Sequence, residues 1–199
     1  MKKPLYSIHY EQQGVIWKLS SAFLEHLPFH DPDMVFLCIG TDRSTGDSLG
    51  PLTGSFLSLY KSFPFPIIGT LETPVHALNL PTVVSHLNDS QTTGPIVAID
   101  ACLGHHYAIG DILLEKGPLW PGKAVQKELP AIGEYNIKVI VNHLHGDSIE
   151  TLQTTRLLHT QDLARVVANA LFLAWHRYCS TQQTSKPHTE LQLTDLAAN

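Results

Sequence analysis

The stretch MVFLCIGTDRSTGDSLGP, residues 34–51, joins an apolar run to a loop rich in glycine and aspartate and then to a helical pattern. The run MVFLCIG is short and continuously apolar, which is typical of a β-strand buried on both faces of a parallel sheet. Residues 49–60 carry apolar side chains at helical spacing, and Pro51 is tolerated in the first turn of a helix. The stretch therefore predicts a strand, a loop and a helix, which is the repeating unit of an α/β fold.

The same alternation continues along the rest of the chain. Apolar side chains at helical spacing predict further helices over residues 16–27 and 75–89, and a long closing helix over residues 151–178. Short apolar runs predict further strands, which lie in FPFPIIGTL (63–71), GPIVAIDA (94–101), AIGDILLEK (108–116) and NIKVIVN (136–142). Strands that alternate with helices predict a three-layer α/β sandwich, with a mostly parallel (mixed) sheet and helices on both faces.

Length and composition predict one domain with a full core. The chain has 199 residues, of which 43% are hydrophobic and 16% are charged. We expect three parts: an N-terminal helix and connection over residues 1–33, the α/β domain over residues 34–178, and a flexible polar tail over residues 179–199.

Charge and hydropathy narrow the range of partners and locations. The formal net charge is -5 and the 13 Lys and Arg residues are scattered, so neither nucleic acid nor a membrane is expected as a partner. The first residues lack the apolar stretch of a secretory signal, and no run is long enough to span a bilayer, which predicts a cytoplasmic protein. The three cysteines are odd in number and far apart, which argues against a disulfide framework. A reactive thiol at Cys102, close to the candidate site described next, stays open.

Three aspartates follow or end apolar runs. Asp42 and Asp47 come after the first run, Asp100 ends the run PIVAID, and Asn142 ends VIVN. Because the carboxyl ends of parallel strands meet at one edge of a sheet, we expect these side chains to lie near one another. A carboxylate at the end of a buried strand is costly unless it is paired or used.

An Asp47–Asp100 pair would have chemical consequences. Two facing carboxyls share one local field, so one pKa is expected to rise and the other to fall, which produces an acid and a base. Such a pair suits the activation of water for hydrolysis. It equally suits a divalent metal bound through oxygens, and spacing alone does not choose between the two.

Two further interpretations concern the same region. Ser44, Thr45, Asp47 or Ser48 could simply cap the helix that follows the loop. Backbone amides of the loop could also bind an anion, although the loop has neither a Walker pattern nor a dinucleotide fingerprint.

Histidines near the predicted rim raise the question of a metal. His143 and His145 lie close to Asp147 in HLHGD, and His105 and His106 follow the strand of the candidate site. Two histidines and a carboxylate can hold zinc or nickel, but this spacing is a weak signal. We therefore expect no metal and no cofactor.

Several blocks resemble the YyaC family of sporulation proteins (DUF1256-type), which occurs in spore-forming Firmicutes. These blocks are CIGTDRSTGDSLGPLTG (38–54), GTLETPVHALNL (69–80), VAIDACLG (97–104), GPLWPGKAVQKELPAIG (117–133) and LQTTRL (152–157). The similarity covers roughly residues 34–174.

That family is similar in turn to the spore germination protease, an atypical aspartic-type endopeptidase with two essential aspartates. The matching segments here are GDSLGP, AIDACLG and WPGKAVQKEL, so the resemblance implies catalytic roles for Asp47 and Asp100. It also implies the α/β fold of hydrogenase-maturation peptidases, in which two carboxylates and a histidine bind nickel. No residue of this chain matches that histidine.

The combined prediction is a peptidase-like hydrolase of sporulation or germination, located in the cytoplasm, the forespore or the spore core. Asp47 and Asp100 would activate water and protonate the leaving amine of a peptide or protein substrate. The loop would supply backbone donors for substrate and oxyanion. Its predicted substrate-binding residues are Gly40, Thr41, Asp42, Gly46 and Ser48. The alternatives are a non-catalytic binding or regulatory protein that keeps the fold, and a metal-dependent hydrolase; a homo-oligomer stays open.

Overall fold

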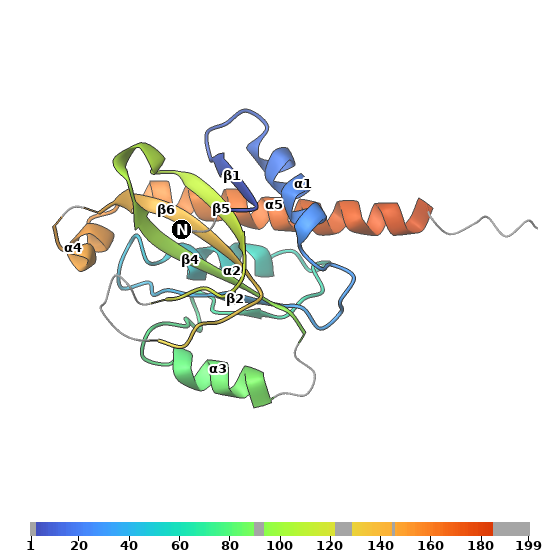
Figure 1. Ribbon diagram of the computed structural model, residues 1–199, viewed down its shortest axis with the longest axis horizontal. Helices are drawn as coiled ribbons and strands as arrows, with labels where there is room; N and C mark the ends of the chain where they lie inside the picture. The colour runs from blue at the N-terminus through green and yellow to red at the C-terminus, as the bar shows by residue number, and fades with distance from the viewer. Residues whose placement is uncertain (1–2, 90–93, 122–128, 145, 185–199) are drawn as a thin grey trace, which may run out of the picture.

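A mixed β-sheet forms the middle layer of the computed structural model, which describes residues 3–89, 94–121, 129–144 and 146–184 (Figure 1). Within these residues the sheet has six strands in the order β1-β5-β6-β4-β2-β3. The strands are β1 (Tyr6–His9), β2 (Val35–Cys38), β3 (Ile67–Ile68), β4 (Ile96–Gly104), β5 (Asp111–Lys116) and β6 (Tyr135–His143). Helices cover both faces, which confirms the predicted three-layer sandwich.

The centre of the sheet is parallel and its β1–β5 side is antiparallel. Strands β6, β4, β2 and β3 pair in parallel, whereas β5 pairs antiparallel with both β6 and β1. All four residues of β2, which lies between β3 and β4, are buried, as expected of a strand in a parallel sheet that is covered on both faces. The strand β1 was not predicted, because its four residues form too short a pattern and it is held in place by pairing with β5.

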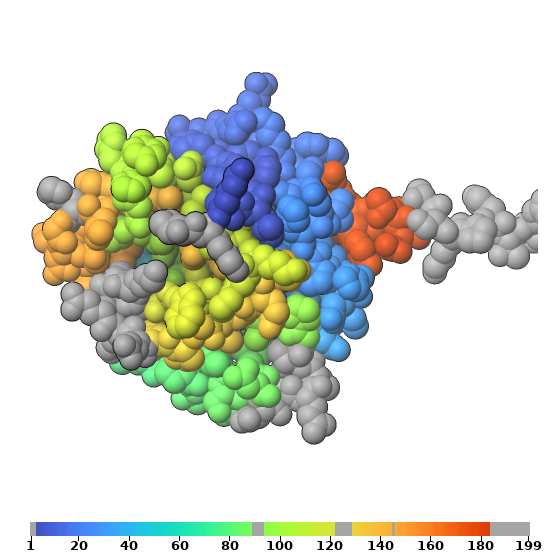
Figure 2. All heavy atoms as spheres, in the orientation of Figure 1, coloured from blue at the N-terminus to red at the C-terminus, as the bar shows by residue number. Residues whose placement is uncertain are grey.

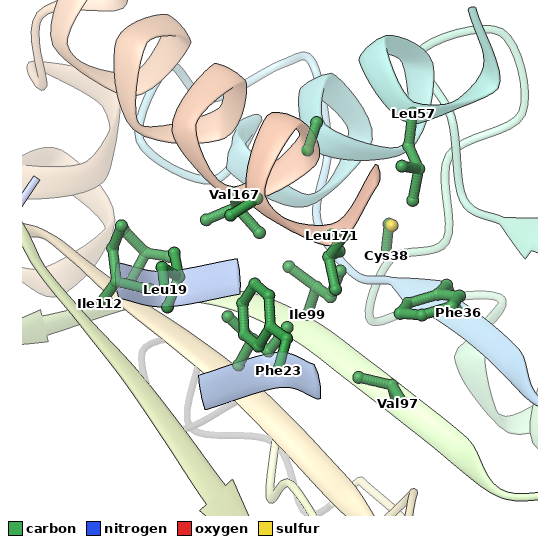
Figure 3. Packing of buried hydrophobic residues seen from close by; sticks show 14 of the residues in the cluster. Leu19, Phe23, Phe36, Cys38, Leu57, Val97, Ile99, Ile112, Val167 and Leu171 are labelled. Carbon is green, nitrogen blue, oxygen red and sulfur yellow. The ribbon is translucent and has the colours of Figure 1, made fainter. Parts of the chain in front are cut away.

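Helices pack against both faces of the sheet, and most of those in the described residues lie on one face. The helices α1 (Val15–His26), α2 (Leu49–Ser58) and α5 (Leu157–Thr184) share one core, whereas α3 (Leu80–Asp89) lies across the sheet from them (Figure 1). Figure 3 shows α5 side chains meeting those of α1 and of the sheet. The labelled residues include Leu19, Phe23, Ile99, Ile112, Val167 and Leu171. Burying each such side chain fully contributes roughly 1.5–3 kcal/mol, and this face holds more of the buried apolar side chains than the other face does.

The predicted single closing helix is wrong, because two helices occupy that region. The helix α4 (Ser148–Gln153) ends at a break over residues 154–156, after which α5 begins. The carbonyl of Leu152 accepts the backbone N–H of Gly46, from the loop after β2, at 2.8 Å. A loop that is distant in the sequence therefore donates a hydrogen bond to the last turn of α4. The last turns of α5 extend past the sheet (Figure 1) and project from the body of the molecule (Figure 2). Residues 185–199 lie outside the described part.

None of the helices in the described residues has the length and apolar character needed to cross a bilayer.

Candidate functional site

The loop after β2 is closed at its neck by backbone hydrogen bonds. Gly40 has φ +142°, and a Cβ at this position would collide with the carbonyl of Asp47, so glycine is required. The N–H of Gly40 donates to the carbonyl of Val75 at 2.8 Å, and the N–H of Thr41 donates to the carbonyl of Asp47 at 3.2 Å. These bonds hold Asp47 directly beside the end of β2.

The far side of the loop is fastened to α4. Besides the Gly46 bond, the hydroxyl of Thr45 donates to the carbonyl of Gln153 at 3.2 Å. A Cβ at Gly46 would lie 2.9 Å from the hydroxyl oxygen of Thr155, so the loop and α4 approach closely. The loop is thus supported from two directions, which preorganises any group that it carries.

The structure bears on the capping interpretation. Ser48 occupies the N-cap position of α2, but its side chain makes no capping bond; its hydroxyl donates to the carbonyl of Thr45 at 2.7 Å. The carboxylate of Asp47 interacts with the backbone N–H of Thr41, which belongs to the same loop and not to α2. Asp47 therefore faces the strand ends and does not serve as the cap of α2.

Asp100 lies within β4 and does not end it, which corrects the sequence prediction. The pairing of β4 with β2 stops at Ile99, opposite Cys38, whereas the pairing with β6 continues through Gly104, with a register shift after Cys102. β4 is longer than its neighbour because β6 supplies partners after β2 has left the sheet. From Asp100 onwards, β4 is no longer paired with β2. The loop after β2 lies on this side instead.

Asp100 is partly buried and electrostatically coupled to Asp47. Burial raises the pKa of the Asp100 carboxyl well above its usual value, and the negative charge of Asp47 raises it further. The backbone N–H of Ala101 and the charge of Lys138 act in the opposite direction. The two aspartates picked out from the sequence are therefore brought together.

Asp47 is also partly buried, and burial raises the pKa of its carboxyl. The N–H of Thr41 and the charge of His76, when protonated, work against this rise. The expectation that one pKa rises and the other falls is not met: burial raises both, and more strongly at Asp100. Two such carboxyls titrate as a unit, and the pair tends to keep a proton.

The other predicted loop residues have varied surroundings. Asp42 is exposed, and its carboxylate accepts the hydroxyl of Thr41 at 3.5 Å. The backbone amides of Gly40, Thr41, Gly46 and Ser48 all donate to acceptors within the protein. Substrate binding by these residues stays a prediction.

The residues after β6 support α4. Asn142 donates to the hydroxyl of Thr155 at 3.1 Å, and Asp147 caps α4 by accepting the N–H of Ile149 at 2.8 Å. The rings of His106 and His143 have centroids 6.2 Å apart. His145 lies outside the described residues, and within those residues no group of three His, Cys, Asp or Glu could hold a metal ion.

Cys102 does not have the environment of a reactive thiol. Burial, together with the charge of Asp100, raises the pKa of its thiol to about 12. The group therefore stays protonated at neutral pH, whereas nucleophilic cysteines have a lowered pKa.

Three charged or titratable residues near the pair were missed by the sequence argument: His76, Glu115 and Lys138. Lys138 donates to Glu115 at 2.7 Å, and its charge acts on Asp100. The signal available was a lysine inside the apolar strand NIKVIVN, where a charge needs a partner. The sequence around His76 does not predict that this residue lies near the pair, because its position depends on the contact between its loop and Gly40.

A hollow of about 590 Å³ adjoins this region. It is bounded by β3, by the loop that follows it and by α3, with His76 in its wall. Most of its other lining side chains are apolar, including those of Ile67, Ile68, Val75 and Val83.

Fold and site together define an α/β protein that carries two neighbouring, partly buried carboxyls where the inner strand β2 ends. The chain belongs to the family described as "Protein of unknown function (DUF1256)", whose model matches residues 7–170. It is 42% identical over 140 residues to the "Uncharacterized protein YyaC" of Bacillus subtilis (strain 168), and the match covers 70% of this chain and 68% of that protein. Both matches confirm the family seen in the sequence blocks.

Proposed function

We propose that the protein is a peptidase-like hydrolase of sporulation or germination in which Asp47 and Asp100 activate water to cleave a peptide bond. The observation that carries this proposal is the presence of two partly buried carboxyls beside the end of β2: burial raises the pKa of both, and the charge of Asp47 raises that of Asp100 further. Perturbed carboxyls of this kind cluster at functional sites, because acid–base chemistry needs one protonated and one ionised group.

The proposed reaction uses one proton shared by the pair. The ionised carboxylate takes a proton from water while the water oxygen attacks the peptide carbonyl carbon. The protonated carboxyl then gives its proton to the leaving nitrogen as the C–N bond breaks. The stronger rise of pKa favours Asp100 as the acid, and the N–H of Thr41 together with His76 favours Asp47 as the base.

The hollow beside His76 suits a peptide side chain. Its volume of about 590 Å³ falls in the range of known ligand pockets, and its wall is largely apolar. His76 links the hollow to the pair, because its charge acts on Asp47. A substrate residue seated there would bring its own peptide bond towards the aspartates.

The biological setting rests on the family resemblance. The YyaC family resembles the spore germination protease, whose two aspartates match Asp47 and Asp100. We therefore assign the activity to a spore-forming cell, in the cytoplasm or the forespore.

Cleavage of a complex peptide mixture tests the proposal. The purified protein is incubated with a proteome-derived peptide library, and new termini are identified by mass spectrometry. We expect wild type to cleave, and Asp47→Asn and Asp100→Asn to cleave at least about 100-fold more slowly. Asp33→Asn is the matched control, because this exposed aspartate precedes β2 and lies outside the proposed site.

Each other outcome points to a different function. Equal cleavage by wild type and both asparagine variants rules out the acid–base pair. Loss of cleavage with EDTA, restored by a divalent ion, identifies a metal-dependent hydrolase. Peptides that are retained by the protein but never cleaved identify a binding module.

A further inference from the structure

A row of charged side chains crosses one face of the sheet beside the aspartate pair. Asp100 on β4 pairs in register with Lys138 on β6, so their side chains leave the same face of the sheet. Neighbouring strands lie about 4.8 Å apart, which makes the two residues adjacent. Lys138 lies opposite Leu113 of β5, and Glu115, two residues further along β5, shares the same face.

Glu115 determines where the ammonium group of Lys138 lies. Nζ of Lys138 donates to Oε2 of Glu115 at 2.7 Å, with the side chains only 30% and 22% exposed. Partly buried charges need partners, and this ion pair supplies one for each residue. Lys138 thus has one carboxylate as a direct partner and a second, Asp100, on the adjacent strand.

We infer that Lys138 is a positioning residue of the aspartate site: held by Glu115, it places a positive charge beside Asp100 and so sets the pH range in which the pair keeps a single proton. The catalytic consequence rests on the proposed function. An acid–base pair works only with one carboxyl ionised and one protonated. A nearby cation favours ionisation of one carboxyl, and Glu115 limits this effect by engaging the cation.

Other groups face the same site and must be counted. Asp47 comes from the loop after β2, His76 from the loop before α3, and the Cys102 thiol from β4 itself. The helix α3 presents apolar side chains to this face, those of Leu80 and Val84. In the described part of the chain, Lys138 is the cation that lowers the pKa of Asp100.

The test is an NMR titration of the aspartate carboxyl carbons in the full chain, which needs no substrate. Lys138→Met should move the titration midpoint of the Asp47–Asp100 pair upward by about one pH unit, because the stabilising cation is lost. Glu115→Gln should move it downward, because one negative charge is removed and Lys138 is released towards Asp100. Lys138→Arg keeps the charge and should titrate like wild type.

The opposite directions separate positioning from a structural role. Loss of the ion pair alone would lower stability in both variants without moving the midpoint in opposite directions. Midpoints that stay at the wild-type value, or that move the same way in both variants, overturn the inference. Should Lys138→Met fail to fold, Glu115→Gln and Lys138→Arg still decide it, by a downward shift and by an unchanged midpoint.

The result is independent of peptidase activity. A protein that titrates as expected but cleaves nothing would retain Lys138 as the residue that sets the charge of the pair, while the proposed function fails. A protein that cleaves peptides but shows no change of midpoint would retain the function and lose this inference.

Discussion

Replacing Asp100 by asparagine is expected to stabilise the protein at neutral pH while removing the proposed activity. Burial and the charge of Asp47 raise the pKa of Asp100 in the folded state. Below the pKa of an unfolded aspartate, both states are protonated and no penalty exists. As pH rises towards the folded pKa, the unfolded state ionises first, so the folded state binds more protons and stability falls. Above the folded pKa the loss of stability from ionising Asp100 is complete. Asparagine does not ionise and therefore avoids this loss.

The size of the gain follows from opposing effects. Each pH unit between the folded and unfolded titrations costs about 1.4 kcal/mol. The charge-assisted bond from the N–H of Ala101 and the attraction of Lys138 are weakened in Asp100→Asn, which offsets part of the gain. We expect a net stabilisation of about 1 kcal/mol, or roughly 3 °C in melting temperature for a chain of this size.

Thermal unfolding followed by circular dichroism at pH 5 and pH 8 measures the effect. The difference between Asp100→Asn and wild type should be larger at pH 8 than at pH 5, because the penalty on wild type grows as pH rises. Asp42→Asn, on the exposed part of the loop, should stay within about 0.5 kcal/mol of wild type at both pH values. A variant less stable than wild type at pH 8, by an amount independent of pH, would refute the reasoning and make Asp100 a structural hydrogen-bond acceptor.

Three further predictions concern the loop, the core and the thiol. In urea unfolding, Gly40→Ala should lower the free energy of unfolding by at least about 2 kcal/mol, because the new Cβ would collide with a backbone carbonyl. Gly14→Ala, at a position with positive φ but open space, should lower it by only about 1 kcal/mol. Equal losses in the two variants would contradict the collision. Replacing the fully buried Leu171 by alanine should lower the free energy of unfolding by about 2–5 kcal/mol, whereas Leu158→Ala, at a half-exposed position, should lower it much less. Similar values for the two variants would place the core elsewhere. The thiol of Cys102, with a pKa of about 12, should resist alkylation by iodoacetamide at pH 8 in the folded protein but react after unfolding, and rapid labelling of the native protein would contradict its burial.

Local patterns were enough to predict the parallel core of the sheet and most of the helices. The run MVFLCIG predicted a strand buried on both faces, and residues 49–60 had one apolar side suited to a helix. The two aspartates could also be identified, since carboxylates beside buried strands are costly unless they are used. These properties belong to short segments, so the sequence by itself determined them.

Tertiary structure decided what depends on contacts between distant segments. At the helix break after Gln153, the carbonyl of Leu152 accepts the N–H of Gly46, and no residue near the break predicts this contact with a distant loop. β4 runs past Asp100 because β6 continues beside it. The charges around the pair follow strand register, which places Lys138 next to Asp100 although the two residues are 38 positions apart in the sequence. Register and loop docking are set by the packing of the whole chain, and they determine the electrostatics of the site.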